Sequence, residues 1–117
     1  MKAEGGYYEG SWVNDLKDGQ GTETWNNGEK YIGEYSKGVK QGKGIYYWPD
    51  GSKYEGNFVG GKQDDTGIYT WPSGKRYQGE WKNGKVNGEG IMWNTDKTMY
   101  EGSFRDGSKH GKGKLFW

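Results

Sequence analysis

The chain has 117 residues, the length of one domain, and its 17 basic and 16 acidic residues leave a net charge of +1. Interspersed charges of both signs exclude the strong positive field that steers a protein onto nucleic acid. Scarce branched aliphatics beside 7 Trp, 10 Tyr and 24 Gly exclude a helical or disordered chain and predict an all-β fold.

The absence of cysteine excludes a disulfide framework, a thiolate metal site and a cysteine nucleophile. The sequence shows no signal-peptide pattern, and none of its apolar runs approaches the roughly 20 residues of a membrane-spanning helix. We therefore expect a cytoplasmic protein, with association to a membrane or to the cytoskeleton as a further option.

Residues 1–7 are expected to be a lead-in, and a repeat with a period of 23 residues begins after them. Three positions recur in a fixed register: a tyrosine, a glycine two residues later and a ring four residues later. The tyrosines are Tyr8, Tyr31, Tyr54, Tyr77 and Tyr100, the glycines Gly10, Gly33, Gly56, Gly79 and Gly102, and the rings Trp12, Tyr35, Phe58, Trp81 and Phe104. The period predicts units at residues 8–30, 31–53, 54–76, 77–99 and 100–117, the last incomplete.

The first unit predicts one β-hairpin. Ring and glycine alternate from Tyr8 to Trp12, which is typical of a strand because side chains two apart share a face. A polar turn follows, and a second strand is expected from Gly19 to Trp25, with Gly19, Gly21 and Trp25 on one face. Asn27-Gly28 then predicts a tight turn into the next unit.

The later units repeat this pattern with two departures. In the fourth unit the expected hairpin turn runs from Lys82 to Asn87. The third unit has Asp65 where the others have the first glycine of a Gly-x-Gly pair, and the fourth has Asn94 and Lys97 in place of a tryptophan and a turn glycine. We expect the sheet to be irregular in these two units.

The Gly-x-Gly pairs have two interpretations. A phosphate cradle needs a following helix or a Gly-Lys-Ser/Thr sequence, and the chain has neither. Since glycine normally weakens a strand, we expect both glycines of each pair to be landing surfaces for aromatic rings. Stacked hairpins then form one sheet of ten strands that extends roughly 45 Å.

The units closely resemble the MORN (membrane occupation and recognition nexus) repeat, whose consensus is about Tyr-x-Gly-x-Trp-x-x-Gly-x-x-His-Gly-x-Gly. The stretches that carry the resemblance are "YEGSW", "YIGEY", "YEGNF", "YQGEW" and "YEGSF", each followed by a glycine-rich strand. The resemblance implies an elongated, single-layer antiparallel meander of hairpins. It also implies links to phosphoinositides, or an accessory role beside a SET-domain methyltransferase or a lipid kinase. The consensus histidine survives only as His110.

Catalytic, metal and cofactor sites are not expected. His110 is the only histidine and falls on a repeat position. The acidic residues are spread over outward strand positions at Glu34, Glu55 and Glu80, where a solvated face explains them. Asp64 and Asp65 lack the alternating oxygen ligands of an EF-hand loop.

Two groups of residues are candidates for binding. Large rings on the second strands favour a protein or peptide partner, although burial over the glycines would also explain them; these rings are Trp25, Tyr46, Trp48, Tyr69 and Trp71. A set of lysines gives an alternative, an anionic phospholipid; they are Lys37, Lys40, Lys43 and Lys53. Exposed edge strands add a third option, a homodimer.

Overall fold

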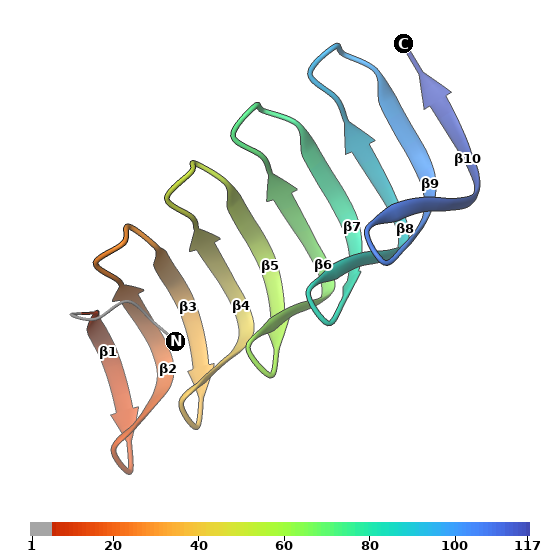
Figure 1. The fold of residues 1–117 in the computed structure, drawn as a ribbon. Helices are drawn as coiled ribbons and strands as arrows, with labels where there is room; N and C mark the ends of the chain where they lie inside the picture. Colours follow the sequence, from red (N-terminus) through yellow and green to blue (C-terminus); the bar gives the residue numbers. More distant parts are fainter. Residues whose placement is uncertain (1–5) are drawn as a thin grey trace.

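The structure, a computed structural model, describes residues 6–117, so most of the expected lead-in lies outside the described residues. Ten antiparallel strands form one open sheet in which sequence neighbours pair. The strands are β1 Tyr7–Val13, β2 Leu16–Thr24, β3 Lys30–Ser36, β4 Val39–Tyr47, β5 Lys53–Val59, β6 Lys62–Thr70, β7 Arg76–Lys82, β8 Lys85–Trp93, β9 Met99–Arg105 and β10 Ser108–Phe116. The sheet measures 49 × 23 × 21 Å, with the hairpins side by side along its length (Figure 1). The predicted single-layer meander is confirmed.

The turn inside each hairpin is two residues long, which is shorter than expected. In the fourth unit β7 ends at Lys82 and β8 begins at Lys85, so only Asn83 and Gly84 form the turn. Both have positive φ, 50° and 82°, as a tight hairpin turn with right-handed strand twist requires. The expected turn from Lys82 to Asn87 is therefore wrong, and the second strand of a unit starts three residues before its first glycine.

The first glycine of each Gly-x-Gly pair lies in a β-bulge. Between the pairs Trp81↔Val86 and Gly79↔Gly90, one residue of β7 faces three residues of β8. Gly88 lies inside this bulge with φ +102°, a conformation that only glycine adopts at little cost. The expectation that this glycine is a landing surface for a ring is wrong; it provides backbone freedom instead.

The second glycine of each pair does carry a ring. A Cβ on Gly90 would lie 2.4 Å from Cε1 and Cζ of Tyr77, well inside van der Waals contact. The Tyr77 hydroxyl crosses this glycine and donates a hydrogen bond to the carbonyl of Glu80 at 3.0 Å. Tyr31 and Tyr54 lie in the same way over Gly44 and Gly67, and all three tyrosines are fully buried. The expectation is confirmed for this column.

The two departing units are regular in their backbones, contrary to expectation. Asp65 adopts φ +67°, and β5 and β6 keep the register shift of the other hairpins. Lys97 adopts φ +72° in the turn, which the Asn94 amide closes by donating to the Thr98 carbonyl at 2.9 Å. Pairing with β7 holds Asp65, and a hydrogen bond from the Lys97 backbone amide to the Asn94 carbonyl at 3.2 Å holds Lys97, in a left-handed conformation that costs an L-residue about 1–2 kcal/mol.

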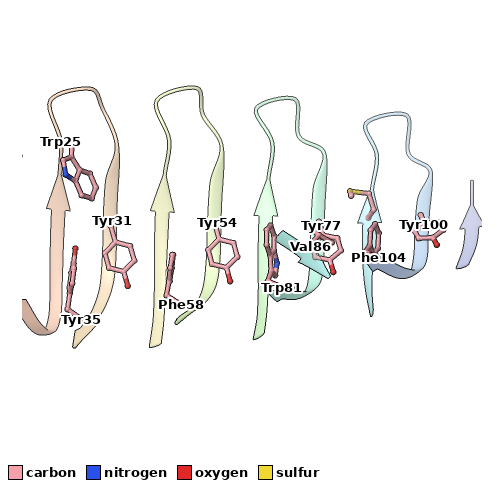
Figure 2. Close-up of a cluster of buried hydrophobic side chains, with 11 residues drawn as sticks. Trp25, Tyr31, Tyr35, Tyr54, Phe58, Tyr77, Trp81, Val86, Tyr100 and Phe104 are labelled. Atoms are coloured by element: carbon pink, nitrogen blue, oxygen red, sulfur yellow. The ribbon is translucent and has the colours of Figure 1, made fainter. Parts of the chain in front are cut away.

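The core is a continuous row of rings on one face of the sheet, which we call the ring face. The tyrosine of each of the first four units meets its own second ring edge-on and also the second ring of the next unit; Tyr54, for example, lies 5.2 Å from both Phe58 and Trp81. Figure 2 shows these rings in successive pairs along the sheet. Edge-to-face pairs add about 0.5–1.5 kcal/mol each beyond burial, so these ring contacts join neighbouring hairpins in addition to the antiparallel pairing between their strands.

Candidate functional site

The five candidate rings form one continuous row on the ring face, which we call the ring ladder: Trp25, Tyr46, Trp48, Tyr69 and Trp71. Tyr46 and Tyr69 lie near the ends of β4 and β6, and the tryptophans directly follow β2, β4 and β6. Successive ring centroids are 5.8, 4.7, 5.4 and 4.7 Å apart. These rings are two residues apart within a unit and 23 residues apart between units, so they share one face of the sheet, and the structure places all five candidate rings in one row.

The ring ladder is half-buried. Trp25 is 7% exposed and belongs to the core, whereas the other four rings are partly buried and pack against the core. The ladder does not cover the glycines, since the tyrosines of the first strands do that. Packing against the core therefore fixes the positions of these four rings, and the remaining part of each ring is exposed and can contact a partner.

Charged groups border the ring ladder. Lys40 lies 5.8 Å above the Trp25 ring and 5.5 Å above the Tyr46 ring, and Lys75 lies 4.9 Å above the Trp71 ring. The Tyr46 hydroxyl donates a hydrogen bond to the Glu29 carboxylate. Burial, and then this carboxylate, raise the pKa of Tyr46 far above its usual value, so the hydroxyl stays neutral. The ladder thus presents apolar rings with the ammonium groups of Lys40 and Lys75 beside them.

The ring ladder is bounded where the repeat changes. In the first unit Glu23 takes the place of Tyr46; it is buried, pairs with Lys17 at 3.0 Å and accepts a hydrogen bond from Tyr35 at 2.7 Å. In the fourth unit Met92 takes the same place. The tryptophan of that unit, Trp93, precedes the ladder position by one residue and so lies on the opposite face, 4.3 Å from the Arg76 guanidinium.

The structure does not bring the four candidate lysines into one patch. Lys40 lies on the ring face over the ladder, while Lys43 lines the opposite face. Lys37 sits in the turn between β3 and β4, and Lys53 begins β5 at the other end of the strands. A single phosphate group therefore could not contact Lys40 and Lys43 at once, because they lie on opposite faces of the sheet.

The opposite face carries a groove that the sequence reasoning missed. It encloses about 600 Å³ over the paired glycines of the hairpins. One row of its lining is mixed, with Ile32, Ile45 and Ile68 beside Glu55 and Gln78, and the other row is polar, with Gln20, Glu34, Lys43, Asn57 and Thr66. The signal was present in the sequence, because isoleucine recurs at positions 45, 68 and 91, one period apart.

The part of the chain that the structure describes contains no cluster of three His, Cys, Asp or Glu residues suited to a metal ion. His110 is exposed on β10, and Glu55 and Glu80 are exposed strand residues. Residues 6–117 also contain no helix that could cross a membrane.

A family model described as MORN repeat matches the chain five times, at residues 8–30, 31–53, 54–76, 77–99 and 100–117. The comparison with curated proteins gave no match. MORN repeats are generally non-catalytic, and they suggest a role in binding or as an adaptor.

Proposed function

The chain belongs to the MORN-repeat family, and we propose that it is a non-catalytic scaffold that binds another protein along the ring ladder. The observation that carries this proposal is the continuous row of five large rings, four of them half-exposed. Tryptophan and tyrosine are the side chains most enriched among residues that dominate binding energy.

The spacing of the ladder favours an amphipathic helix as the partner. Equivalent rings such as Trp48 and Trp71 lie two strands apart, or about 9.6 Å along the sheet. A helix with an apolar residue at every seventh position repeats that residue about every 10.5 Å. The two repeats match closely over the length of the ladder. Acidic residues beside the apolar stripe would meet Lys75 and fix the register of the helix.

The test compares two double variants on opposite faces of the sheet. Trp48→Ala/Trp71→Ala removes two of the four partly exposed rings of the ladder, and Ile45→Ala/Ile68→Ala removes two of the isoleucines that line the groove. Amphipathic helical peptides would be selected by display against the parent chain and then titrated against both variants. We expect the ladder variant to bind at least about 30-fold more weakly, the loss expected for a hot-spot residue, and the groove variant to bind as the parent does.

Each other outcome decides against the ladder. If the groove variant loses binding and the ladder variant keeps it, the partner lies on the opposite face. If neither variant loses binding, both sites are wrong. Far-ultraviolet circular dichroism of the ladder variant must retain the β-sheet spectrum; a variant that unfolds would show that these rings are core residues and would refute their assignment as a binding surface.

A further inference from the structure

The opposite face of the sheet carries a row of side chains that belongs neither to the ring ladder nor to the groove. Its members are direct partners in the pairing of successive strands, and on β3–β7 each of them lies two residues from a residue that lines the groove. Because side chains two apart share a face, the row runs beside the groove. We call it the cation row; its members are Lys30, Tyr47, Lys53, Thr70, Arg76 and Trp93.

The charges of the cation row are all positive. Lys30 and Arg76 are exposed, and Lys53 is partly buried. Within residues 6–117, none of these three side chains forms an ion pair with a carboxylate. Tyr47 and Thr70 lie between the cations and add hydroxyl groups that can donate hydrogen bonds. The row therefore offers positive charges and hydroxyl groups to a ligand, and none of its members is acidic.

One end of the row is prepared for a carboxylate. The guanidinium of Arg76 lies 4.3 Å from the centroid of the Trp93 ring. An arginine that packs on a ring keeps its N–H groups at the edge of the planar guanidinium, where they can donate to both oxygens of a carboxylate. The ring contact thus holds the arginine in place without using its hydrogen-bond donors.

We propose that the cation row binds an acidic peptide in the polyproline II conformation. The three cations lie two strands apart, which is about 9.6 Å along the sheet. A polyproline II chain repeats every three residues, or about 9.3 Å. A carboxylate at every third residue would therefore meet Lys30, Lys53 and Arg76 in turn. A β-strand would lose this match at the second cation, because its same-face side chains are about 6.7 Å apart.

The two rings of the row favour a chain that contains proline. Tyr47 and Trp93 are partly buried, and they lie four strands or about 19 Å apart. Six residues of a polyproline II chain span about 18.6 Å. Aromatic side chains are the usual contacts of proline in this conformation, which also loses little conformational entropy on binding. The expected ligand therefore has a repeat such as Glu-Pro-Pro, with glutamates at the cations and prolines at the rings.

The charge pattern of the whole face disfavours an anionic membrane as the occupant. On β3–β8, the cation row and the two rows beside it carry carboxylates as well as cations: Glu34, Glu55, Glu80 and Glu89 with Lys30, Lys43, Lys53 and Arg76. A flat anionic surface would meet both kinds of charge, whereas a single chain along the row meets the cations. Glu55 lies two residues from Lys53 on β5 and opposes an acidic ligand most directly.

The proposal is independent of the ring ladder, because the cation row lies on the other face of the sheet. Trp48→Ala/Trp71→Ala should therefore leave binding of the acidic peptide unchanged. With both sites occupied, one chain would hold two partners on opposite faces, which is how an adaptor joins them.

The test titrates a peptide of four Glu-Pro-Pro repeats into the 117-residue chain at low salt. Binding is followed by NMR, through the indole N–H of Trp93 and the backbone amides of β3–β8. A peptide of four Gln-Pro-Pro repeats keeps the conformation without the charge and should not bind. A third peptide has the composition of the first with its four glutamates adjacent, and it should bind more weakly because its carboxylates cannot reach successive cations.

Two lysines of the same face provide a matched pair of variants. Lys53 belongs to the cation row, whereas Lys43 lies across the groove. Lys53→Gln should weaken binding about 3–5-fold, the loss expected for one exposed charge pair, and Lys43→Gln should leave it unchanged. Glu55→Gln should strengthen binding by a similar factor. If Lys53→Gln fails to fold, Lys30→Gln provides the same test at an exposed position.

Three results would overturn the proposal. The first is an acidic peptide that shifts none of these signals at millimolar concentration. The second is equal weakening by Lys43→Gln and Lys53→Gln, which would show a general attraction to positive charge. The third is binding to vesicles that contain anionic phospholipid, weakened by Lys53→Gln, in the absence of peptide binding; the occupant would then be a membrane. Equal affinity for the peptide with adjacent glutamates would contradict the match in spacing.

Discussion

The requirement for glycine beneath each tyrosine can be measured at Gly67. The backbone of Gly67 lies outside the left-handed region, so conformational strain does not require glycine there. A Cβ would instead lie 2.3 Å from the hydroxyl oxygen of Tyr54 and 2.4 Å from two of its ring carbons. Gly67→Ala must therefore displace a fully buried ring.

The cost of that displacement can be added up from the contacts of the ring. Tyr54 would lose the hydrogen bond to the Asn57 carbonyl at 2.8 Å, worth about 1 kcal/mol. It would also lose edge-to-face contacts with Phe58 and Trp81, worth about 1 kcal/mol each. Alanine in a strand recovers about 0.5–1 kcal/mol of backbone entropy relative to glycine. We expect a net loss of about 2 kcal/mol or more.

The assay is urea unfolding followed by tryptophan fluorescence and circular dichroism, in a double-mutant cycle with Tyr54→Val. Valine lacks the ring atoms that meet the added Cβ, so Gly67→Ala should then be neutral or slightly stabilising. Gly60→Ala is the control for backbone strain alone, since a Cβ there meets nothing within 4 Å and φ is +60°. If Gly67→Ala costs the same with and without the tyrosine, the ring is not the reason for the glycine.

Three further predictions concern the bulge, alkaline pH and lipid. Asp65→Gly should raise the free energy of unfolding by about 1 kcal/mol by relieving a left-handed residue, and an unchanged urea midpoint would contradict this. Burial raises the pKa of Tyr77 to about 12 from 10.0. Its contribution to stability should be complete below pH 10 and be lost between pH 10 and 12, as tyrosinate absorbance and circular dichroism would show; unchanged stability over that range would refute the assignment. In liposome sedimentation at low salt, Lys37→Ala and Lys43→Ala should leave phosphoinositide binding unchanged, whereas a shared lipid site would lose affinity with either.

The sequence predicts the architecture well because, in a single-layer sheet of repeats, each strand pairs only with strands adjacent to it in the sequence. Each unit touches its neighbours in sequence, so an unbroken period sets the strand order, and alternation within a strand sets the face of each ring. Trp48 and Trp71 could therefore be placed in one row without coordinates. The distances and the depth of burial within the row could not, since they depend on how far the strands twist.

The errors of the sequence reasoning share one cause, which is the two roles of glycine. Gly88 and Gly90 look equivalent in sequence, but one supplies a positive φ in a bulge and the other lies flat beneath a ring. Asp65 separates the two roles, because it occupies the bulge position and never the ring position. An aspartate tolerates a left-handed backbone at modest cost, whereas any side chain beneath Tyr54 would collide with it. The sequence therefore contained evidence that the columns differ.

The columns of the repeat also differ in how much surface each of them leaves exposed. A column that stays half-exposed in successive units, as at Trp48 and Trp71, indicates a surface that the fold itself leaves open. The repeat thus serves as its own control, because equivalent positions in successive units have the same backbone environment. The sheet has no second layer. Positions that are buried in successive units therefore contribute to stability, whereas positions that stay partly exposed in successive units are available for binding.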